Sequence, residues 1–393
     1  MSDALASAVA GVGGLNADDA DAWDRAGLLP TDLLGKLAAD ALLCAQVPAA
    51  YGGRGLTSAD NGELTAHVGS SCSSLRSVMT SQGMAAWTIE RFGTPDQRAA
   101  FLPRLTGGDI AAAGFSERAA GSDLSAMTTR IRREGDSVVL NGHKVWVTAA
   151  HYADLLVLFG RYDESGGTDE SDGAGGTYEG RGGGGGGAEA AAVVVPAATP
   201  GVRVERVADP LGCRAAGHAD ITLDGVRVPA ANVLGGTALP LPLLVTTALA
   251  YGRMSVAWGC VGMLRGCLTA AARHATHRRQ FGVPLAEHQL VARHLAELYA
   301  AEQTATRVCE HASRCWDDGS PDQVTATVLA KHVSAGNAAR GAATAVQVLA
   351  SAGARDGHVV ARAYRDAKLM ELIEGSNEMC QLMLARHVVD SAE

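Results

Sequence analysis

The feature that most constrains the fold is the hydrophobic period, which changes twice along the chain. Apolar residues repeat at helical spacing over residues 1–109, and the pattern becomes extended over residues 110–236. Helical spacing returns over residues 237–393 and persists to the end. The sequence therefore predicts a mostly α protein with three parts: an N-terminal helical domain, a middle β domain and a C-terminal helical bundle.

The last part contains four long amphipathic segments that are joined by short breaks. These segments are Thr246–His277, Ala286–Trp316, Asp322–Ala352 and Val359–Glu371. Four long helices with brief connections are typical of an up-and-down bundle. A further helix is expected at the C-terminus of the chain, with Ser376 as its N-cap.

Cap residues divide the first part of the chain into helices. We expect Thr31 to cap one helix, and Thr94 and Pro95 to be the cap and the first residue of another. Two further helices are expected at Asn61–Gly69 and Ser77–Phe92, because apolar residues recur there at helical spacing.

In the β domain, Asn141-Gly142 with extended residues on both sides predicts a two-residue hairpin. Further strands are expected at Leu155–Phe159, Ala191–Val195, Val202–Val207, Ile221–Leu223 and Val226–Val228. The tract 163–189 is rich in glycine and acidic residues, so we expect a flexible extension of a hairpin. Its glycines do not form a phosphate loop, because no Lys-Ser/Thr pair follows them.

Composition excludes several classes of partner. The 393 residues carry a formal net charge of −9 and no basic block, which argues against nucleic acid and anionic membranes. The uncharged run Val228–Gly252 contains three prolines, so we interpret it as a domain connection rather than a membrane span. The start lacks a signal-peptide pattern, and we expect a cytoplasmic location. The eight dispersed cysteines indicate reduced, buried thiols, and no metal site is expected.

One carboxylate, Glu374, stands on a break that contains Gly375, just before the expected C-terminal helix. Ser376 would cap this helix, and Glu378 lies in its first turn, where a negative charge is stabilising. On these residues alone, a solvated carboxylate at a helix N-terminus is the ordinary interpretation.

Two stretches of the β domain carry polar and aromatic residues that could hold a ligand. Phe115-Ser116 and Gly121-Ser122 place small residues and hydroxyls in a loop, where backbone N–H groups can approach a polar or anionic ligand. Trp146 and Thr148 follow on an expected strand. A tryptophan at this position is by itself equally suited to a core.

The string Arg278–Gln289 contains a possible phosphate contact, because an arginine fork can bind phosphate or pyrophosphate in a bidentate manner. The residues that follow predict a loop and the start of the next helix. A surface arginine is the alternative interpretation of Arg278. Nearby histidines lack a carboxylate companion suited to a metal.

Together, these stretches resemble the acyl-CoA dehydrogenase superfamily over nearly the whole chain. The resemblance implies an FAD enzyme in which Glu374 removes the proton α to a thioester carbonyl, while the β-hydride passes to flavin N5. A carboxylate suits this step when a closed, dry site raises its pKa. The resemblance also places Arg253 near this base, where it would orient or support the site; a structural salt bridge is the alternative.

The resemblance implies a cofactor site that two subunits share. Trp146 would cover the flavin, Thr148 would bond near N5 and O4, and the Arg278–Gln289 string would reach the FAD of a neighbouring subunit, in a dimer or a tetramer. The implied FAD contacts are Phe115, Ser116, Gly121, Ser122, Trp146, Thr148, Arg278, Gln280, Phe281, Leu285, His288, Gln289, Gln347, Ser376 and Glu378. The chain departs from the family pattern at Arg118, where proline is usual, and at Ser351, where glycine is usual.

Three segments resemble a narrower group, the acyl-ACP dehydrogenases of polyketide pathways that build hydroxymalonyl- or methoxymalonyl-ACP. These segments are Val68–Ile89, Pro210–Pro229 and the run EGSNEMCQ. The resemblance implies a three-carbon, 2-hydroxylated acyl group on an acyl carrier protein. His218 is a candidate polar residue of the pocket, and a surface histidine at the end of a strand is the alternative interpretation. The electron acceptor is not indicated. A catabolic short-chain acyl-CoA dehydrogenase, a flavin oxidase or monooxygenase, and an inactive helical binding protein remain alternatives.

Overall fold

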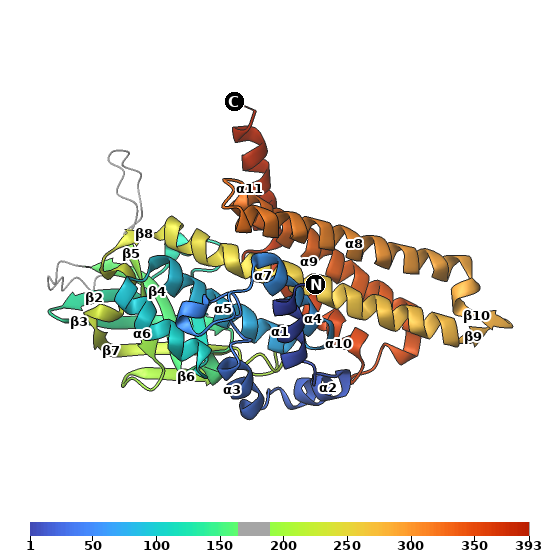
Figure 1. Cartoon of the computed structure of the whole chain (residues 1–393), viewed down its shortest axis with the longest axis horizontal. Coiled ribbons are helices and arrows are strands. Elements are labelled where there is room, and N and C mark those ends of the chain that lie inside the picture. The colour runs from blue at the N-terminus through green and yellow to red at the C-terminus, as the bar shows by residue number, and fades with distance from the viewer. Residues whose placement is uncertain (164–188, 393) are drawn as a thin grey trace.

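The computed structural model describes residues 1–163 and 189–392, and the predicted tract 163–189 lies almost entirely outside the described residues. Helices of the first part, a β domain and a long helical bundle follow one another along the chain and pack together (Figure 1). The predicted fold class, mostly α with a central β domain, is confirmed.

The first part contains six α-helices. They are α1 (Asp3–Gly11), α2 (Ala17–Ala26), α3 (Thr31–Ala39), α4 (Ser58–Ser71), α5 (Ser73–Phe92) and α6 (Pro95–Thr106). Thr94 caps α6 in a complete capping box with Gln97, and Pro95 is its first residue, as the sequence predicted. The predicted cap Thr31 is wrong by one residue, because Pro30 occupies the N-cap position and makes no side-chain hydrogen bond.

The middle part forms an eight-stranded sheet. Its strands are β1 (Ala111–Gly114), β2 (Arg130–Glu134), β3 (Ser137–Val147), β4 (Leu155–Asp163), β5 (Glu189–Pro196), β6 (Val202–Arg206), β7 (Ala219–Pro229) and β8 (Leu239–Pro240). The order is β6-β7-β3-β2-β4-β5-β8, with β1 paired parallel to β4. Predicted strands Ile221–Leu223 and Val226–Val228 belong to one strand, β7, which continues through Asp224-Gly225.

The predicted hairpin at Asn141-Gly142 is wrong. Strand β3 runs through both residues, and the pairing with β7 shifts register between Leu140 and Gly142. Gly142 is needed for a close approach rather than a turn, since an added Cβ would lie 2.5 Å from Thr129 Oγ1. The reversal of the chain occurs instead between β2 and β3, where Glu134 pairs with Ser137.

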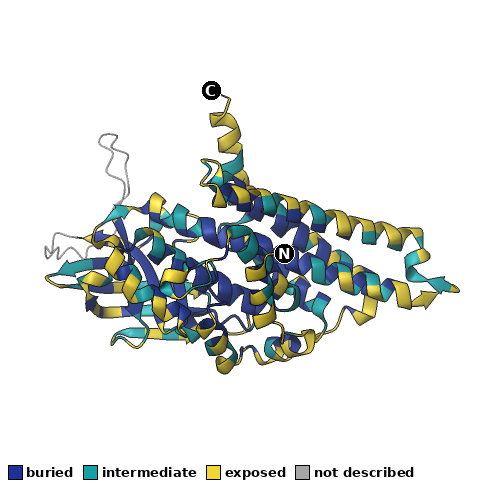
Figure 2. Cartoon of the chain, viewed as in Figure 1, coloured by how far each residue is buried: buried dark blue, intermediate teal, exposed yellow. Residues whose placement is uncertain are grey.

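The last part is a bundle of long helices, as predicted. The helices are α7 (Leu241–His277), α8 (Gln289–Asp317), α9 (Gln323–Leu349), α10 (Val359–Leu372) and α11 (Asn377–Asp390). A short hairpin of β9 (Arg279–Gln280) and β10 (Val283–Pro284) joins α7 to α8 at the far end. Helix α11 stands out from the bundle, and it and the hairpin are largely exposed (Figures 1 and 2).

Helix α7 is the central helix of the bundle. It is long and apolar enough to cross a membrane by length and composition, but 72% of its most apolar window is buried inside the protein. Helices α4, α5, α8, α9 and α10 pack against it. This burial is the pattern of a central bundle helix. All eight cysteines are free and buried, which agrees with the predicted thiols.

Candidate active site

Glu374 lies in the break between α10 and α11, in the left-handed region of the backbone (φ 57°). Its Oε2 atom is buried and, within the described part of the chain, has no hydrogen-bond partner. Gly252 of α7 makes room for this carboxylate, because an added Cβ would lie 2.3 Å from Oε2. A strained backbone that holds an unpaired, buried carboxylate oxygen is the kind of feature that collects at functional sites.

Two buried cations hold this break in place through its carbonyl groups. Arg253 of α7 donates from Nε to the carbonyl oxygen of Glu374 at 3.0 Å. Lys331 of α9 donates from Nζ to the carbonyl of Gly375 at 2.8 Å and to Asn377 Oδ1 at 3.1 Å. Both cations therefore bind the main chain of the break and leave the carboxylate of Glu374 free.

Burial raises the pKa of Glu374 to about 7, although the charges of Arg253, Lys331 and Arg76 act in the opposite direction. Desolvation disfavours the ionised form of a carboxylate, and nearby cations favour it. A carboxylate with this pKa is ionised in a large fraction of molecules near neutral pH and binds a proton well there. These are the properties of a general base.

The predicted residues Ser116, Trp146 and Thr148 lie together at the ends of β1 and β3. The N–H of Val145 donates to the carbonyl of Ser116 at 2.9 Å, which joins the two segments. Trp146 has a positive φ of 56°, and 51% of the residue's surface remains exposed. Thr148 Oγ1 lies 3.2 Å from Nδ1 of His218.

Helix α5 connects this group to Glu374. Ser81 donates from Oγ to the carbonyl of Thr148 at 2.8 Å. Met84 lies three residues further along α5. A Cβ added to Gly252 would lie 3.1 Å from Cε of Met84, and the same Cβ would contact Glu374. Since residues three apart share a helix face, Thr148 and Glu374 lie next to adjacent turns of α5.

A buried ion pair fixes the loop that follows β1. Lys144 donates from Nζ to Glu117 Oε1 at 2.7 Å and to the carbonyl of Phe115 at 3.2 Å. Glu117 also accepts from Thr128 and from the N–H of Thr129. Burial alone would raise the pKa of Glu117, but these hydrogen bonds lower it well below its usual range. The loop is thereby held rigidly against β3.

The predicted segment Arg278–Gln289 lies far from Glu374. Gly252, beside the carboxylate, and Arg278 are 26 residues apart on α7 and its cap, which corresponds to about 39 Å along a helix. The segment is exposed, and Phe281 has 95% of its surface accessible. Gln347, near the end of α9, is also exposed. One chain therefore does not bring these two groups of predicted site residues together.

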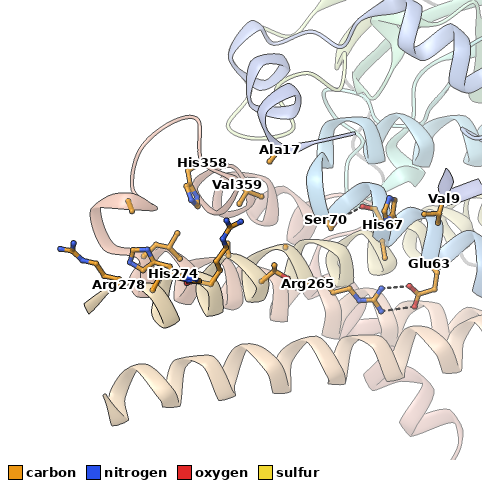
Figure 3. A pocket seen from close by; sticks show the side chains of 18 of the residues that line it. Val9, Ala17, Glu63, His67, Ser70, Arg265, His274, Arg278, His358 and Val359 are labelled. Carbon is orange, nitrogen blue, oxygen red and sulfur yellow. Dashed lines mark hydrogen bonds and ion pairs between the residues drawn. The ribbon is translucent and has the colours of Figure 1, made fainter. Parts of the chain in front are cut away.

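A large cavity also lies at this far end. It has a volume of about 1120 Å³, and Arg278 is among its lining residues, whereas Glu374 is not (Figure 3). Its wall includes His274 of α7 and the ion pair of Arg265 with Glu63, at 2.6 Å. The cavity is thus separate from the carboxylate, and its basic lining suits a ligand with negative charge.

Comparison with known proteins identifies the family. Family models match the acyl-CoA dehydrogenase N-terminal domain at residues 14–109, the middle domain at 112–226 and the C-terminal domain at 243–389. Cyclohex-1-ene-1-carbonyl-CoA dehydrogenase of Geobacter metallireducens is 30% identical over 90% of this chain and 88% of its own length. The chain belongs to the acyl-CoA dehydrogenase family.

Two further similarities bear on the position of this acyl-CoA dehydrogenase within the family. The mitochondrial short-chain specific acyl-CoA dehydrogenase of Homo sapiens is 29% identical over 94% of this chain and 85% of its own. The structure of FkbI, for biosynthesis of the methoxymalonyl extender unit of the FK520 polyketide, is 60% identical with a TM-score of 0.86. That similarity covers 99% of both chains.

The acyl-CoA dehydrogenase is an FAD-dependent oxidoreductase that acts on acyl thioesters. The described residues fit this cofactor. Trp146 offers an exposed indole next to the Thr148 hydroxyl. The N–H groups of Gly121 and Ser122 lie in an exposed turn and bind no other group in residues 1–163 and 189–392. Such an aromatic face with free donors suits a flavin and its phosphates.

The remaining predicted residues lie at the start of α11. Ser376 is its N-cap, and Oγ accepts from the N–H of Met379 at 3.4 Å, as predicted. Glu378 is exposed in the first turn, where hydrogen bonds with its own backbone N–H and with Ser376 lower its pKa. The backbone of the break is the only link between these two residues and Glu374. The structure shows no contact between either of them and Trp146 or Thr148.

Sequence reasoning missed three residues beside Glu374: Arg76, Lys331 and Gly252. Arg76 did leave a signal, because it is the only Asp, Glu, Lys or Arg between Glu63 and Glu90. A single charge in a long stretch with no other charged residue indicates a buried cation that needs a partner. Gly252 had no such signal, since its importance depends on which side chain packs against it.

Proposed function

We propose that this enzyme oxidises a short, oxygenated acyl thioester carried on an acyl carrier protein, in the formation of a hydroxymalonyl or methoxymalonyl extender unit for polyketide synthesis. The observation that carries the dehydrogenase chemistry is the buried, unpaired Oε2 atom of Glu374, whose carboxyl pKa burial raises to about 7. The 60% identity with FkbI over 99% of both chains supports the extender-unit pathway.

In this proposal Glu374 takes the α-proton of the thioester, and the electron pair of that C–H bond forms the new carbon–carbon double bond. FAD, when bound, accepts the hydride that leaves the β-carbon. Arg253 and Lys331 do not take the proton; they fix the backbone of Glu374 and Gly375. The carboxylate therefore keeps its orientation while its charge changes.

The test is anaerobic reduction of the bound flavin by matched thioesters. The same acyl group is presented on acyl carrier protein and on coenzyme A, and the loss of flavin absorbance is followed in a stopped-flow instrument. We expect faster reduction by the acyl-ACP, and loss of most of this reduction in Glu374→Gln, which cannot accept the α-proton.

Each alternative gives a different result in this experiment. Equal or faster reduction by acyl-CoA would favour a catabolic short-chain dehydrogenase. Rapid reoxidation of the reduced flavin by O₂ would favour an oxidase or monooxygenase. Near-normal reduction in Glu374→Gln would mean that another group takes the proton.

We propose that FAD lies between two copies of this chain. Phe115, Ser116, Gly121, Ser122, Trp146 and Thr148, with Ser376 and Glu378 nearby, serve the flavin side in one copy. The second copy supplies Arg278, Gln280, Phe281, Leu285, His288, Gln289 and Gln347. The support is the separation of about 39 Å along α7 between Gly252 and Arg278, which exceeds the length of an extended FAD. A cytoplasmic location stays a prediction, which cell fractionation would test.

Mixed oligomers test the shared site. Arg278→Gln and Glu374→Gln are each expected to be inactive alone, because each lacks one side of every site. When the two variants are unfolded, mixed equally and refolded, half of the dimers contain one copy of each. One of the two sites in such a dimer is intact, so about a quarter of all sites should regain activity. No recovery of activity in the mixture would place both residues in the same site of one chain.

A further inference from the structure

His218 directly precedes β7, and only 7% of its surface is exposed. Its Nδ1 atom lies 3.2 Å from the hydroxyl oxygen of Thr148, the residue that we place beside the flavin. Its other ring nitrogen, Nε2, is buried and has no hydrogen-bond partner in residues 1–163 and 189–392. Within that part of the chain, the hydroxyl of Thr148 is therefore the one polar partner of this imidazole.

Backbone hydrogen bonds fix the two segments that carry this contact. The N–H of Ala149 donates to the carbonyl of Ala216 at 3.0 Å, and the N–H of His151 donates to the carbonyl of Gly217 at 3.1 Å. Ala149 directly follows the threonine, and Gly217 directly precedes the histidine. The main chain therefore holds the imidazole and the hydroxyl side by side.

Helix α5 holds the same two segments. Ser74 Oγ accepts from the N–H of Ala215 at 3.2 Å, shortly before the histidine. Two helical turns further along α5, Ser81 Oγ donates to the carbonyl of Thr148 at 2.8 Å. Both partners are thus anchored to one rigid helix, and their contact exists before any ligand binds.

The protonation of the ring follows from its surroundings. Burial, together with the charge of Arg76, lowers the pKa of His218 to about 4, so the ring is neutral at pH 7. A neutral imidazole carries one N–H donor and one bare nitrogen. A proton on Nδ1 has the oxygen of Thr148 as its acceptor, whereas a proton on Nε2 would be buried without an acceptor. The proton therefore belongs on Nδ1.

This protonation leaves the hydroxyl proton of Thr148 free for a ligand. A threonine hydroxyl has one proton and two lone pairs. When the Nδ1–H of His218 donates to a lone pair, the hydroxyl proton points toward a different acceptor. Thr148 is only half-buried, so the hydroxyl can meet a bound group. A flavin ring carries nitrogen and oxygen acceptors that suit such a donor.

We propose that His218 is a positioning residue of the cofactor site: its Nδ1–H orients the hydroxyl of Thr148 so that this hydroxyl donates to bound, oxidised FAD. The inference rests on the proposed place of FAD beside Thr148. It goes further, because it assigns a role to a residue that acts through the threonine. A hydroxyl that is already oriented loses less rotational freedom when the cofactor binds, so the affinity for FAD is higher.

A double-substitution cycle on FAD affinity tests this role without turnover. The FAD-loaded proteins are diluted, and the dissociation constant of oxidised FAD is obtained from the fluorescence of the released cofactor. We expect Thr148→Val to weaken FAD binding about tenfold and His218→Leu about threefold to tenfold. The variant with both substitutions should bind FAD as well as Thr148→Val alone does, because the histidine acts only through the hydroxyl.

Two conservative substitutions identify the ring nitrogen that acts. The side-chain amide of asparagine reaches the position of Nδ1, and that of glutamine reaches the position of Nε2. His218→Asn should therefore keep the native affinity to within about twofold, while His218→Gln should lose as much as His218→Leu. His151→Leu is the matched control, since His151 belongs to the same pair of segments and is exposed. We expect it to bind FAD as the native protein does.

Several results would overturn the inference. Losses that add in the double variant would mean that His218 supports the fold or meets FAD independently of Thr148. Equal affinities in His218→Asn and His218→Gln would exclude a role for Nδ1, and this pair decides the question if His218→Leu does not fold. Weaker binding in Thr148→Val with native binding in His218→Leu would refute this inference alone. Native binding in both would also refute the proposed place of FAD beside Thr148.

Discussion

The raised pKa of Glu374 has a consequence for stability that can be measured separately from catalysis. The folded state holds a proton on this carboxyl with a pKa of about 7, against about 4.5 as its ordinary value. This difference corresponds to about 3 kcal/mol. Below both values the group is protonated in the folded and the unfolded chain alike. As the pH rises, the unfolded chain loses the proton first, so the folded protein becomes less stable until the pH passes about 7.

The perturbation is Glu374→Gln, which keeps the shape of the side chain and removes its titration. Between pH 5 and pH 8 the native protein should lose about 2 to 3 kcal/mol of stability through this single group, and the variant should not. The free energy of unfolding of the variant relative to the native protein should therefore rise by that amount over this range. The amide differs from the acid by a constant term, which cancels when the two pH values are compared.

The assay is urea unfolding followed by tryptophan fluorescence, at pH 5 and pH 8, with equal protein and FAD concentrations throughout. Fixed concentrations matter because bound cofactor and association both change apparent stability. Glu378→Gln is the control: the pKa of this exposed carboxyl is lowered, so its titration lies below this pH range. If the free energy of unfolding had the same pH dependence in the native protein and in Glu374→Gln, burial would not raise the pKa of this carboxyl. That result would refute the argument.

Two further predictions concern the packing of the site. Gly252→Ala should remove most activity while FAD remains bound, because the added Cβ would lie 2.3 Å from Oε2 of Glu374 and displace the carboxylate. Flavin absorbance measures bound FAD and single-turnover reduction measures activity; full activity would contradict the close contact. Lys144→Met should destabilise the protein by about 3 to 5 kcal/mol, because it leaves the buried carboxylate of Glu117 without its cation. Chemical unfolding measures this loss of stability, and a loss below about 1 kcal/mol would contradict the prediction.

The sequence was sufficient for the order of the domains, because the period of apolar residues differs between helices and strands. It was insufficient where tertiary packing decides the outcome. Asn141-Gly142 has the composition of a tight turn, yet the glycine serves a close approach to Thr129 inside a continuous strand. Local preference therefore gave way to a contact between segments that the sequence does not display.

For the predicted site, the sequence named candidate residues and could not give the distances between them. Ser116, Trp146 and Thr148 lie together because β1 and β3 are joined near Val145. Arg278 belongs to the same family pattern and lies at the other end of α7. A motif specifies which residues meet a cofactor, but it does not specify whether they come from one copy of the chain or from two.

The position of Glu374 depends on three separate parts of the chain, and this dependence accounts for its strained backbone. A positive φ is unfavourable for glutamate, so the local sequence does not favour this conformation by itself. Arg253 of α7 and Lys331 of α9 bind the carbonyls of the break, and Ser376 caps the helix that follows it. The carboxylate can therefore reach its buried, unpaired position only after α7, α9 and α11 have packed. A base that would be solvated in a loose chain becomes desolvated, and hence a stronger proton acceptor, as a consequence of tertiary folding.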